Sequence, residues 1–105
     1  MSLLHISSLE QLNTLLQTEN TVVIDFFATW CGPCKMLAPV FDSLSQELTD
    51  VDFVKVDIDQ SLELAQKFGI TTVPTMMIFK DGKVVDTLVG FMPKDNLKAK
   101  VQAHL

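Results

Sequence analysis

The sequence predicts an α/β fold in which a mixed β-sheet is covered by helices on both faces. Segments with the apolar periodicity of strands alternate with segments whose apolar residues recur at helical spacing, in the order β-α-β-α-β-α-β-β-α. Each β-α-β unit predicts two parallel strands joined by a right-handed crossover. The last two strands flank Asp81-Gly82, a strong signal for a tight turn, and are therefore expected to form an antiparallel hairpin.

The first strand, the first helix and a central strand are predicted within residues 3–29. A short strand is expected over Leu3–Ile6. Ser7 and Glu10 match a capping box, and leucines recur at helical spacing from there to about Thr18. Thr21–Thr29 is a nearly continuous apolar run rich in β-branched and aromatic residues, which predicts a central strand buried on both faces.

A long helix and a third strand come next. The helix is expected from about Pro33 to Leu48, with an apolar stripe at helical spacing along one side. Pro39 lies inside this pattern and should kink the helix, because a proline removes one backbone hydrogen bond. Val51–Ile58 alternates between apolar and polar residues, as a third strand does.

The C-terminal part of the chain predicts a short helix, the hairpin and a last helix. Asp59 or Ser61 can cap the short helix, which continues through Phe68 and ends at Gly69. The hairpin strands are expected at Thr75–Lys80 and Lys83–Val89, and the last helix has Pro93 in its first turn and Leu97, Val101 and Leu105 on its inner face.

Length and charge limit the functions that the chain can have. Its 105 residues predict one domain, residues 1–105, without an internal linker or repeat. The net charge is -5, and the eight basic residues are all lysines, which excludes a basic nucleic-acid-binding face. No apolar run has the length of a membrane span. The N-terminal segment lacks the pattern of a secretory signal, so a reducing, cytosolic setting is expected.

Both cysteines of the chain lie in one short segment, Trp30–Lys35, which reads Trp-Cys-Gly-Pro-Cys-Lys. On a helix, this spacing places the two Cβ atoms roughly 5–6 Å apart, close to the separation that a disulfide requires. A bridge across so short a loop removes little entropy from the unfolded chain, so a purely structural role is not expected. The pair is suited instead to making and breaking one bond.

The predicted elements place Cys31 just beyond a central strand and at the start of a helix, where open α/β sheets bind their ligands. Free backbone N–H groups and the helix dipole favour a negative charge at this end, so we expect the pKa of the Cys31 thiol to be lowered. Cys34, one turn further on, faces the core and should stay protonated longer. Pro33 suits the first helical turn and stiffens the loop, and Gly32 allows another backbone to approach closely.

Two other chemistries also use paired cysteines. A structural zinc site requires about four Cys or His ligands. Only His5 and His104 accompany the pair, so no metal site within one chain is predicted, whereas zinc shared between two chains stays open. Haem attachment would require a histidine after the second cysteine, where the sequence has Lys35.

The whole chain resembles the thioredoxins. The hexapeptide Trp30–Lys35 follows a strand that contains Asp25, and Val73-Pro74-Thr75, Phe79–Gly82 and Gly90 then come in the order and at the spacing of that family. This resemblance implies the thioredoxin fold, with a central mixed five-stranded sheet flanked by four helices. It also implies the activity of a thiol–disulfide oxidoreductase.

Asp25 stands within an apolar strand, so its carboxyl group should be buried and its pKa should be raised. From the residues alone, a buried acid satisfied by nearby donors is the simpler interpretation. The resemblance implies instead that Asp25 relays a proton to or from Cys34. Lys55 matches a family lysine whose ammonium lies near this acid, and a solvent-facing lysine is an equal alternative.

Pro74 follows Val73 at the entry to a predicted strand. The resemblance implies a cis peptide bond there, facing the disulfide, with the Val73 backbone available to hydrogen-bond a bound peptide. It also implies a flat apolar contact surface around the thiol, formed by Trp30, Gly32, Pro33, Ile70, Thr72, Pro74, Gly90 and Phe91.

Two residues depart from the family pattern. Phe27 stands where many thioredoxins have a second tryptophan, which should alter spectroscopy more than chemistry. Phe91 follows Gly90 where a small residue is usual, and it is expected to narrow the substrate groove or to extend its apolar surface.

The first functional hypothesis is a protein-disulfide reductase that uses Cys31 as the nucleophile, Cys34 as the resolving thiol and Asp25 as its proton acceptor. The resemblance implies that the chain binds no cofactor and receives electrons from NADPH through a flavin-dependent thioredoxin reductase. It also implies a monomer whose other partners are client proteins with exposed disulfides.

A redox-independent binding subunit is the second hypothesis. An oxidant or isomerase is the least favoured, because Gly-Pro between the cysteines resembles the reducing branch.

Overall fold

Five strands form one mixed sheet in the computed structural model, which describes residues 3–105. The order of the strands across the sheet is β1-β3-β2-β4-β5. Along the chain the elements are β1 (Leu3–His5), α1 (Leu9–Leu15), β2 (Thr21–Phe27), α2 (Gly32–Glu47), β3 (Val51–Asp57), α3 (Leu62–Lys67), β4 (Thr75–Lys80), β5 (Lys83–Val89) and α4 (Lys94–Gln102). The expected element order and the mixed sheet of an α/β fold are therefore confirmed.

The pairing of β2 with its two neighbours determines where the functional segments meet. β3 runs parallel to β2, so Phe27 at the end of β2 pairs with Asp57 at the end of β3. β4 runs antiparallel to β2, so Thr75 at the start of β4 pairs with Phe26 near the end of β2. The segment that follows β2 and the segment that precedes β4 consequently lie at the same edge of the sheet.

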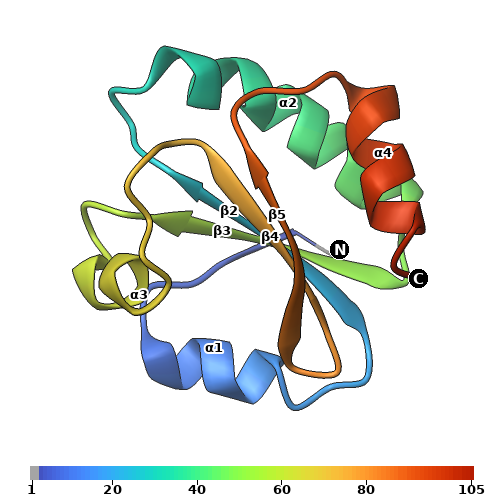
Figure 1. The fold of residues 1–105 in the computed structure, drawn as a ribbon, viewed down its shortest axis with the longest axis horizontal. Coiled ribbons are helices and arrows are strands. Elements are labelled where there is room, and N and C mark those ends of the chain that lie inside the picture. The colour runs from blue at the N-terminus through green and yellow to red at the C-terminus, as the bar shows by residue number, and fades with distance from the viewer. Residues whose placement is uncertain (1–2) are drawn as a thin grey trace.

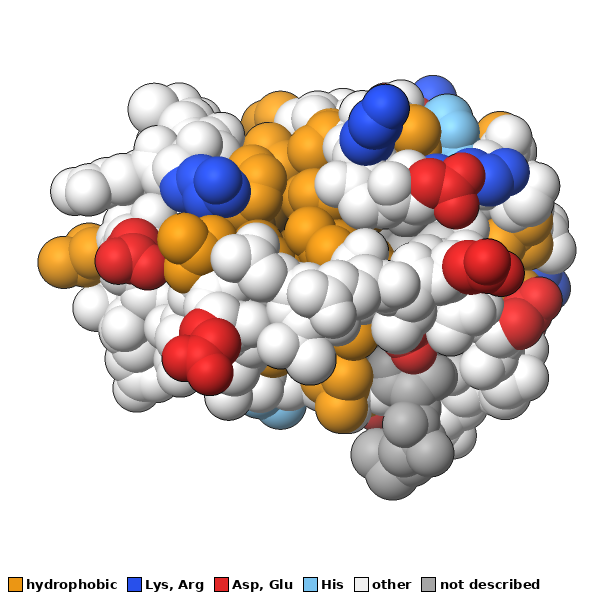
Figure 2. Space-filling view, turned by 90° about the horizontal axis from the view of Figure 1, so that it is seen from below, with side chains coloured by type: hydrophobic (Ala, Val, Ile, Leu, Met, Phe, Trp, Pro, Cys, Tyr) orange, Lys and Arg blue, Asp and Glu red, His pale blue; other side chains and the backbone are white. Residues whose placement is uncertain are grey.

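The helices form a layer on each face of the sheet, with α2 and α4 on one face and α1 and α3 on the other (Figure 1). Successive residues of β2 point to opposite faces. Val23 packs under α2 and α4, whereas Val22 and Ile24 pack against α1 and α3. Both packed clusters are apolar, and some apolar side chains remain visible on the surface of the α1/α3 side (Figure 2). Within residues 3–105, no helix is long and apolar enough to cross a membrane.

The first helix begins one residue later than the capping pattern predicted. Ser8, not Ser7, is the N-cap, and the N–H of Gln11 donates to Ser8 Oγ at 3.1 Å. The Gln11 side chain accepts from the N–H of Ser8 at 3.2 Å, which completes the capping box. The sequence contains two overlapping capping-box patterns, Ser7 with Glu10 and Ser8 with Gln11. The structure uses the second one. The helix also ends at Leu15, before the expected boundary.

Three other helix ends test the expected signals. Ser61 is the N-cap of α3, but its side chain makes no capping hydrogen bond. Gly69 ends this helix with φ +62°, as predicted, because glycine adopts this left-handed conformation without steric cost. Pro93 is the N-cap of α4 instead of lying in its first turn. Leu105 lies beyond the end of α4 and is 51% exposed, so its predicted place on the inner face was wrong.

Candidate active site

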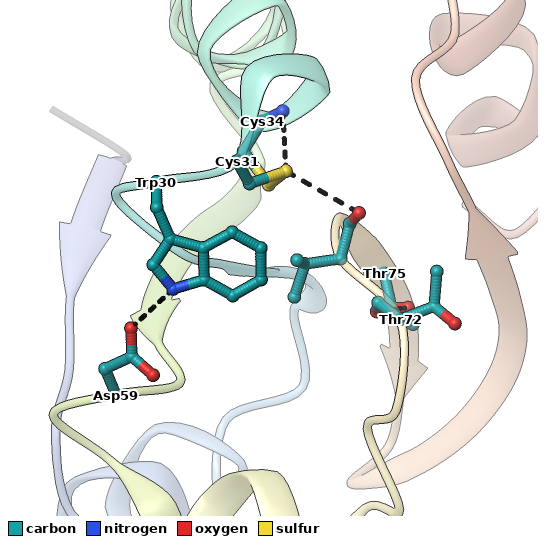
Figure 3. Close-up of a disulfide and its surroundings, with 7 residues drawn as sticks. Trp30, Cys31, Cys34, Asp59, Thr72 and Thr75 are labelled. Atoms are coloured by element: carbon teal, nitrogen blue, oxygen red, sulfur yellow. Dashed lines mark hydrogen bonds between the residues drawn. A yellow bond between two sulfur atoms is a disulfide. The ribbon is translucent and has the colours of Figure 1, made fainter.

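The two cysteines form a disulfide at the start of α2, directly after the loop that leaves β2 (Figure 3). Cys31 is the N-cap residue of this helix, and its Sγ accepts a hydrogen bond from the N–H of Cys34 at 3.2 Å. The Cα atoms are 5.2 Å apart. Cys31 and Cys34 are only 5% and 3% exposed. Pro33 occupies the first helical turn, as expected, where its missing N–H has no partner to lose.

The position of Cys31 favours the ionised form of its sulfur once the disulfide is reduced. A thiolate there would accept the N–H of Cys34 and would lie at the positive end of a 16-residue helix. Thiolates are the reactive species in disulfide exchange. The local backbone of α2 therefore provides the electrostatic environment that an attacking cysteine requires.

The turn before β4 lies directly opposite the disulfide. The Val73–Pro74 peptide bond is cis, in agreement with the expectation. The carbonyl oxygen of Val73 lies 3.6 Å from Cys31 Sγ, and the Val73 side chain packs against the small cluster that contains both cysteines. The N–H of Gly90 donates to the carbonyl oxygen of Pro74 at 2.9 Å, which places the segment after β5 beside this turn.

Asp25 is fully buried in β2, on the face of the sheet covered by α2. Neither of its carboxylate oxygens has a hydrogen-bond partner among residues 3–105, so the interpretation of an acid satisfied by nearby donors does not hold. Burial raises the pKa of Asp25 from 3.8 to about 7, although the positive charge of Lys55 partly lowers it. A carboxyl group in this state can accept or release a proton near neutral pH.

Lys55 is the register partner of Asp25 on the neighbouring strand β3. Its side chain is partly buried, and its ammonium nitrogen lies 4.5 Å from the centroid of the Phe27 ring. Because this charge lowers the pKa of Asp25, the structure favours the electrostatic interpretation of Lys55 over a purely solvent-facing one. Phe27, the departure from the usual tryptophan, serves here as the aromatic contact for that ammonium.

The residues expected to form the contact surface differ in their exposure. Trp30 is 68% exposed and Phe91 is 38% exposed, which is unusual for aromatic side chains of this size. Gly32, Pro33 and Thr72 are also exposed, whereas Ile70 and Gly90 are partly buried and Pro74 is buried. Gly90 has φ +92°, a conformation that a side chain would strain.

One residue near the site was not predicted to act there. Trp30 Nε1 donates a hydrogen bond to Asp59 Oδ2 at 2.9 Å (Figure 3). The sequence had suggested Asp59 only as a possible helix cap. A stronger signal was available, because Trp30 follows β2 and Asp59 follows β3, and the ends of neighbouring parallel strands meet at one edge of a sheet.

A sulfur pair that is held in contact by one helical turn can be opened and closed with little movement of the chain. The backbone carbonyl of Val73 lies opposite the pair, and the strand that leads to the pair contains Asp25, a buried carboxyl group whose pKa is raised to about 7 by burial. These properties define the class of thiol–disulfide oxidoreductases that carry their redox centre as a cysteine pair.

Comparison with known proteins gives the family. The sequence profile of the thioredoxin family matches residues 4–103. The chain is 47% identical over 94 residues to thioredoxin of Mycoplasmoides gallisepticum, covering 90% of this chain and 94% of that protein. It is 49% identical over 89 residues to thioredoxin of Bacillus subtilis, covering 84% and 86% of the two chains. The crystal structure of a Nicotiana alata thioredoxin matches with a TM-score of 0.89 and 41% identity, covering 98% of this chain and 92% of that one.

The chain belongs to the thioredoxin family. Its five-stranded mixed sheet with four helices is the thioredoxin fold, and it is a thiol–disulfide oxidoreductase with the Cys31–Cys34 pair as its redox-active centre.

Proposed function

We propose that this protein reduces disulfides in other proteins, with Cys31 as the attacking thiolate and Cys34 as the resolving thiol. The observation that carries this assignment is the placement of Cys31 Sγ at the N-cap of α2, where the N–H of Cys34 donates to it at 3.2 Å. Only one of the two sulfurs has this position, because Cys34 lies inside the first turn of the helix. The two cysteines therefore have different roles.

The reaction consists of two exchange steps. The Cys31 thiolate attacks one sulfur of a substrate disulfide, a mixed disulfide forms, and the other substrate sulfur leaves as a thiolate that takes up a proton. Cys34 then loses its proton and attacks Cys31 Sγ, so the Cys31–Cys34 bond forms and the second substrate thiol is released. Two electrons pass from the dithiol to the substrate.

We assign Asp25 as the group that accepts the Cys34 proton in the second step. It lies on the strand face that α2 covers, it is buried, and its pKa is raised to about 7 by burial. Lys55 adjusts this value through its positive charge. The carboxyl group has no competing hydrogen-bond donor within the described part of the chain.

The contact surface for a client protein is proposed to comprise Trp30, Gly32, Pro33, Val73, Pro74, Gly90 and Phe91. The Val73 backbone lies beside the disulfide at the entry to β4, so an extended client segment can hydrogen-bond to it in the manner of an added strand. Trp30 directly precedes Cys31, and Phe91 follows Gly90, whose N–H donates to the carbonyl oxygen of Pro74; both aromatic side chains are exposed. Such surfaces bind exposed apolar patches.

The oxidised pair must be reduced again after each cycle. Family membership supports a flavin-dependent thioredoxin reductase that carries electrons from NADPH as the donor, so the chain itself would hold no cofactor. A monomeric, single-domain protein in the cytoplasm fits this role, because the reducing environment there keeps thiols available.

The decisive experiment uses Cys34→Ser. This variant should accumulate mixed disulfides between Cys31 and client proteins, because the resolving step is lost. Cys31→Ser serves as the matched control and should form none. If Cys34→Ser forms no adduct while Cys31 remains titratable, the two-step mechanism is wrong. Reduction of insulin with dithiothreitol, and then with NADPH and a thioredoxin reductase, tests the overall activity and the electron donor.

A redox-independent binding role is the second candidate, and the exposure of Trp30 and Phe91 favours it. A variant with both cysteines replaced by serine separates the two functions. Retention of biological activity in that variant would support the binding role, and its loss would support disulfide reduction.

A further inference from the structure

Trp30 combines high exposure with a fixed orientation. The side chain is 68% exposed, yet its indole N–H donates to Asp59 Oδ2 at 2.9 Å. The two residues are 29 positions apart and belong to the loops that follow β2 and β3 (Figure 3). An exposed tryptophan without such a partner would sample several rotamers. Asp59 therefore restricts the residue that directly precedes the attacking cysteine.

The backbone of Asp59 is itself held by the turn after β3. The N–H of Asp59 donates to Asp57 Oδ1 at 2.9 Å. The carbonyl oxygen of Asp57 accepts from the N–H groups of Gln60 and Ser61 at 3.2 and 2.9 Å. Side-chain bonds of this kind from aspartate to a backbone N–H two residues on stabilise tight turns.

The same turn is fastened to the end of β2. The N–H of Ile58 donates to the carbonyl oxygen of Phe27 at 2.9 Å, which extends the β2–β3 pairing beyond Asp57. Ile58 also packs against the cluster that contains both cysteines. The backbone that carries the Asp59 carboxylate is consequently fixed relative to the disulfide through the β2–β3 pairing, independently of the loop that carries Trp30.

Binding a protein substrate orders any mobile side chain at the interface, and this ordering reduces affinity. We propose that Asp59 is a positioning residue that holds the Trp30 indole as a fixed side of the protein-substrate contact surface, and that Asp57 holds Asp59 in place. The proposal rests on the assignment of Trp30 to the client contact surface. A small disulfide such as hydroxyethyl disulfide reaches the sulfur without covering the indole. The Trp30–Asp59 hydrogen bond should therefore increase kcat/KM for protein substrates relative to kcat/KM for small disulfides.

The test compares Asp59→Ala, Asp59→Asn and the matched control Asp50→Ala. Alanine removes the acceptor, whereas asparagine keeps an oxygen that can accept the indole N–H but removes the charge. Asp50 is an exposed aspartate just before β3, at the opposite end of the strand that Asp59 follows, so Asp50→Ala produces the same change in net charge far from Trp30. Each variant is assayed for kcat and KM with insulin and with hydroxyethyl disulfide.

Asp59→Ala should raise KM for insulin about three- to tenfold, so that the ratio of kcat/KM for insulin to kcat/KM for the small disulfide falls by the same factor. Asp59→Asn should restore this ratio to within about twofold of the wild-type value, and Asp50→Ala should leave it unchanged. In a Trp30→Phe background, which lacks the indole N–H, Asp59→Ala should have no further effect on the ratio.

Fluorescence gives a second readout, because Trp30 is the only tryptophan of the chain. Time-resolved anisotropy should show faster motion of the indole in Asp59→Ala than in the wild type, and Asp59→Asn should resemble the wild type. An unchanged insulin-to-small-disulfide ratio in Asp59→Ala, or an equal loss in Asp59→Asn, would overturn the proposal. If the wild type itself failed to reduce insulin, the proposed function would be wrong instead, so the two failures are distinguishable.

Discussion

The two faces of strand β2 are equally buried and chemically opposite. Toward α1 and α3, the strand presents Val22, Ile24 and Phe26, which belong to an entirely apolar cluster. Toward α2 and α4, it presents Val23 and then Asp25, which is as inaccessible as its neighbours but has no hydrogen-bond partner among the described residues. One face therefore only stabilises the fold, whereas the other includes a buried acid that destabilises the fold when it is ionised and that we propose as the proton acceptor for Cys34.

The pKa of Asp25 determines how the α2-side face of β2 contributes to the free energy of unfolding at each pH. The unfolded chain releases the Asp25 proton near the model-peptide value of 3.8, and the folded protein keeps it until about pH 7. Between these values the folded state binds more protons than the unfolded state, so stability falls as the pH rises. The contribution of the α2 face is thus largest in mild acid, and that of the α1/α3 face should not depend on pH.

The largest expected effect is on the apolar face. Phe79→Ala removes a buried ring that makes an edge contact with Phe68 at 5.6 Å. The change should lower the free energy of unfolding by about 3–5 kcal/mol, because burial is lost and a cavity forms. Urea denaturation should give the same loss at pH 4.5 and at pH 8, and insulin reduction per folded molecule should be unchanged. A loss that varies with pH would contradict the separation of the two faces.

Asp25→Asn should have the opposite sign. The isosteric neutral side chain removes the penalty of burying a charge, so the protein should be more stable by about 2–4 kcal/mol at pH 8. Near pH 4 the change should be close to zero, because Asp25 is then protonated in the folded protein. Insulin reduction should slow by about tenfold or more, since Cys34 loses its proton acceptor. Denaturation curves at the two pH values, together with the insulin assay, test both parts.

Lys55→Met should have a smaller effect on the same face. The ammonium of Lys55 lowers the pKa of Asp25, so its removal should raise that pKa by about half a unit to one unit. Methionine keeps much of the stem that packs beside Phe27. The titration of the Asp25 carboxyl carbon by NMR measures the shift, and Lys100→Met, on α4, provides the control. An unchanged titration in Lys55→Met would show that solvent screens this charge.

The smallest expected effect concerns Ser61, whose hydroxyl is the other buried polar group without a partner in residues 3–105. Ser61→Ala should stabilise the protein by about 0.5–1 kcal/mol, because no capping hydrogen bond is lost and an unsatisfied group is removed. Ser8→Ala is the matched control at the start of α1, where the capping box exists, and it should destabilise by about 1 kcal/mol. Thermal unfolding of both variants measures the contrast.

Periodicity and turn signals in the sequence were sufficient for the fold. The apolar run of β2, the Asp81-Gly82 turn and Gly69 each correspond to an observed strand, turn or helix end. Helix starts were less certain, because two overlapping capping patterns at Ser7 and Ser8 differ only by one residue. The choice between them depends on which leucines the sheet buries, and that is a property of the packed molecule.

The candidate site was predictable where its residues are neighbours in sequence or follow a family pattern. The placement of Cys31 at a helix start and the burial of Asp25 both agree with the expectations. The hydrogen bond between Trp30 and Asp59 has no local signal, because it joins two loops that only the parallel pairing of β2 and β3 brings together. The lack of partners for the Asp25 oxygens likewise follows from packing alone.

The far end of α2 is joined to α4 by charged side chains, since Glu47 interacts with both Lys94 and Lys98. Leu97 and Val101 of α4 also pack into the same apolar cluster as Phe41 of α2. Helix α2, which begins at the cysteine pair, and helix α4, which follows Phe91, are thus connected far from the disulfide. The segment that carries Phe91 is therefore connected, through α4, to the end of α2 that lies away from the cysteines.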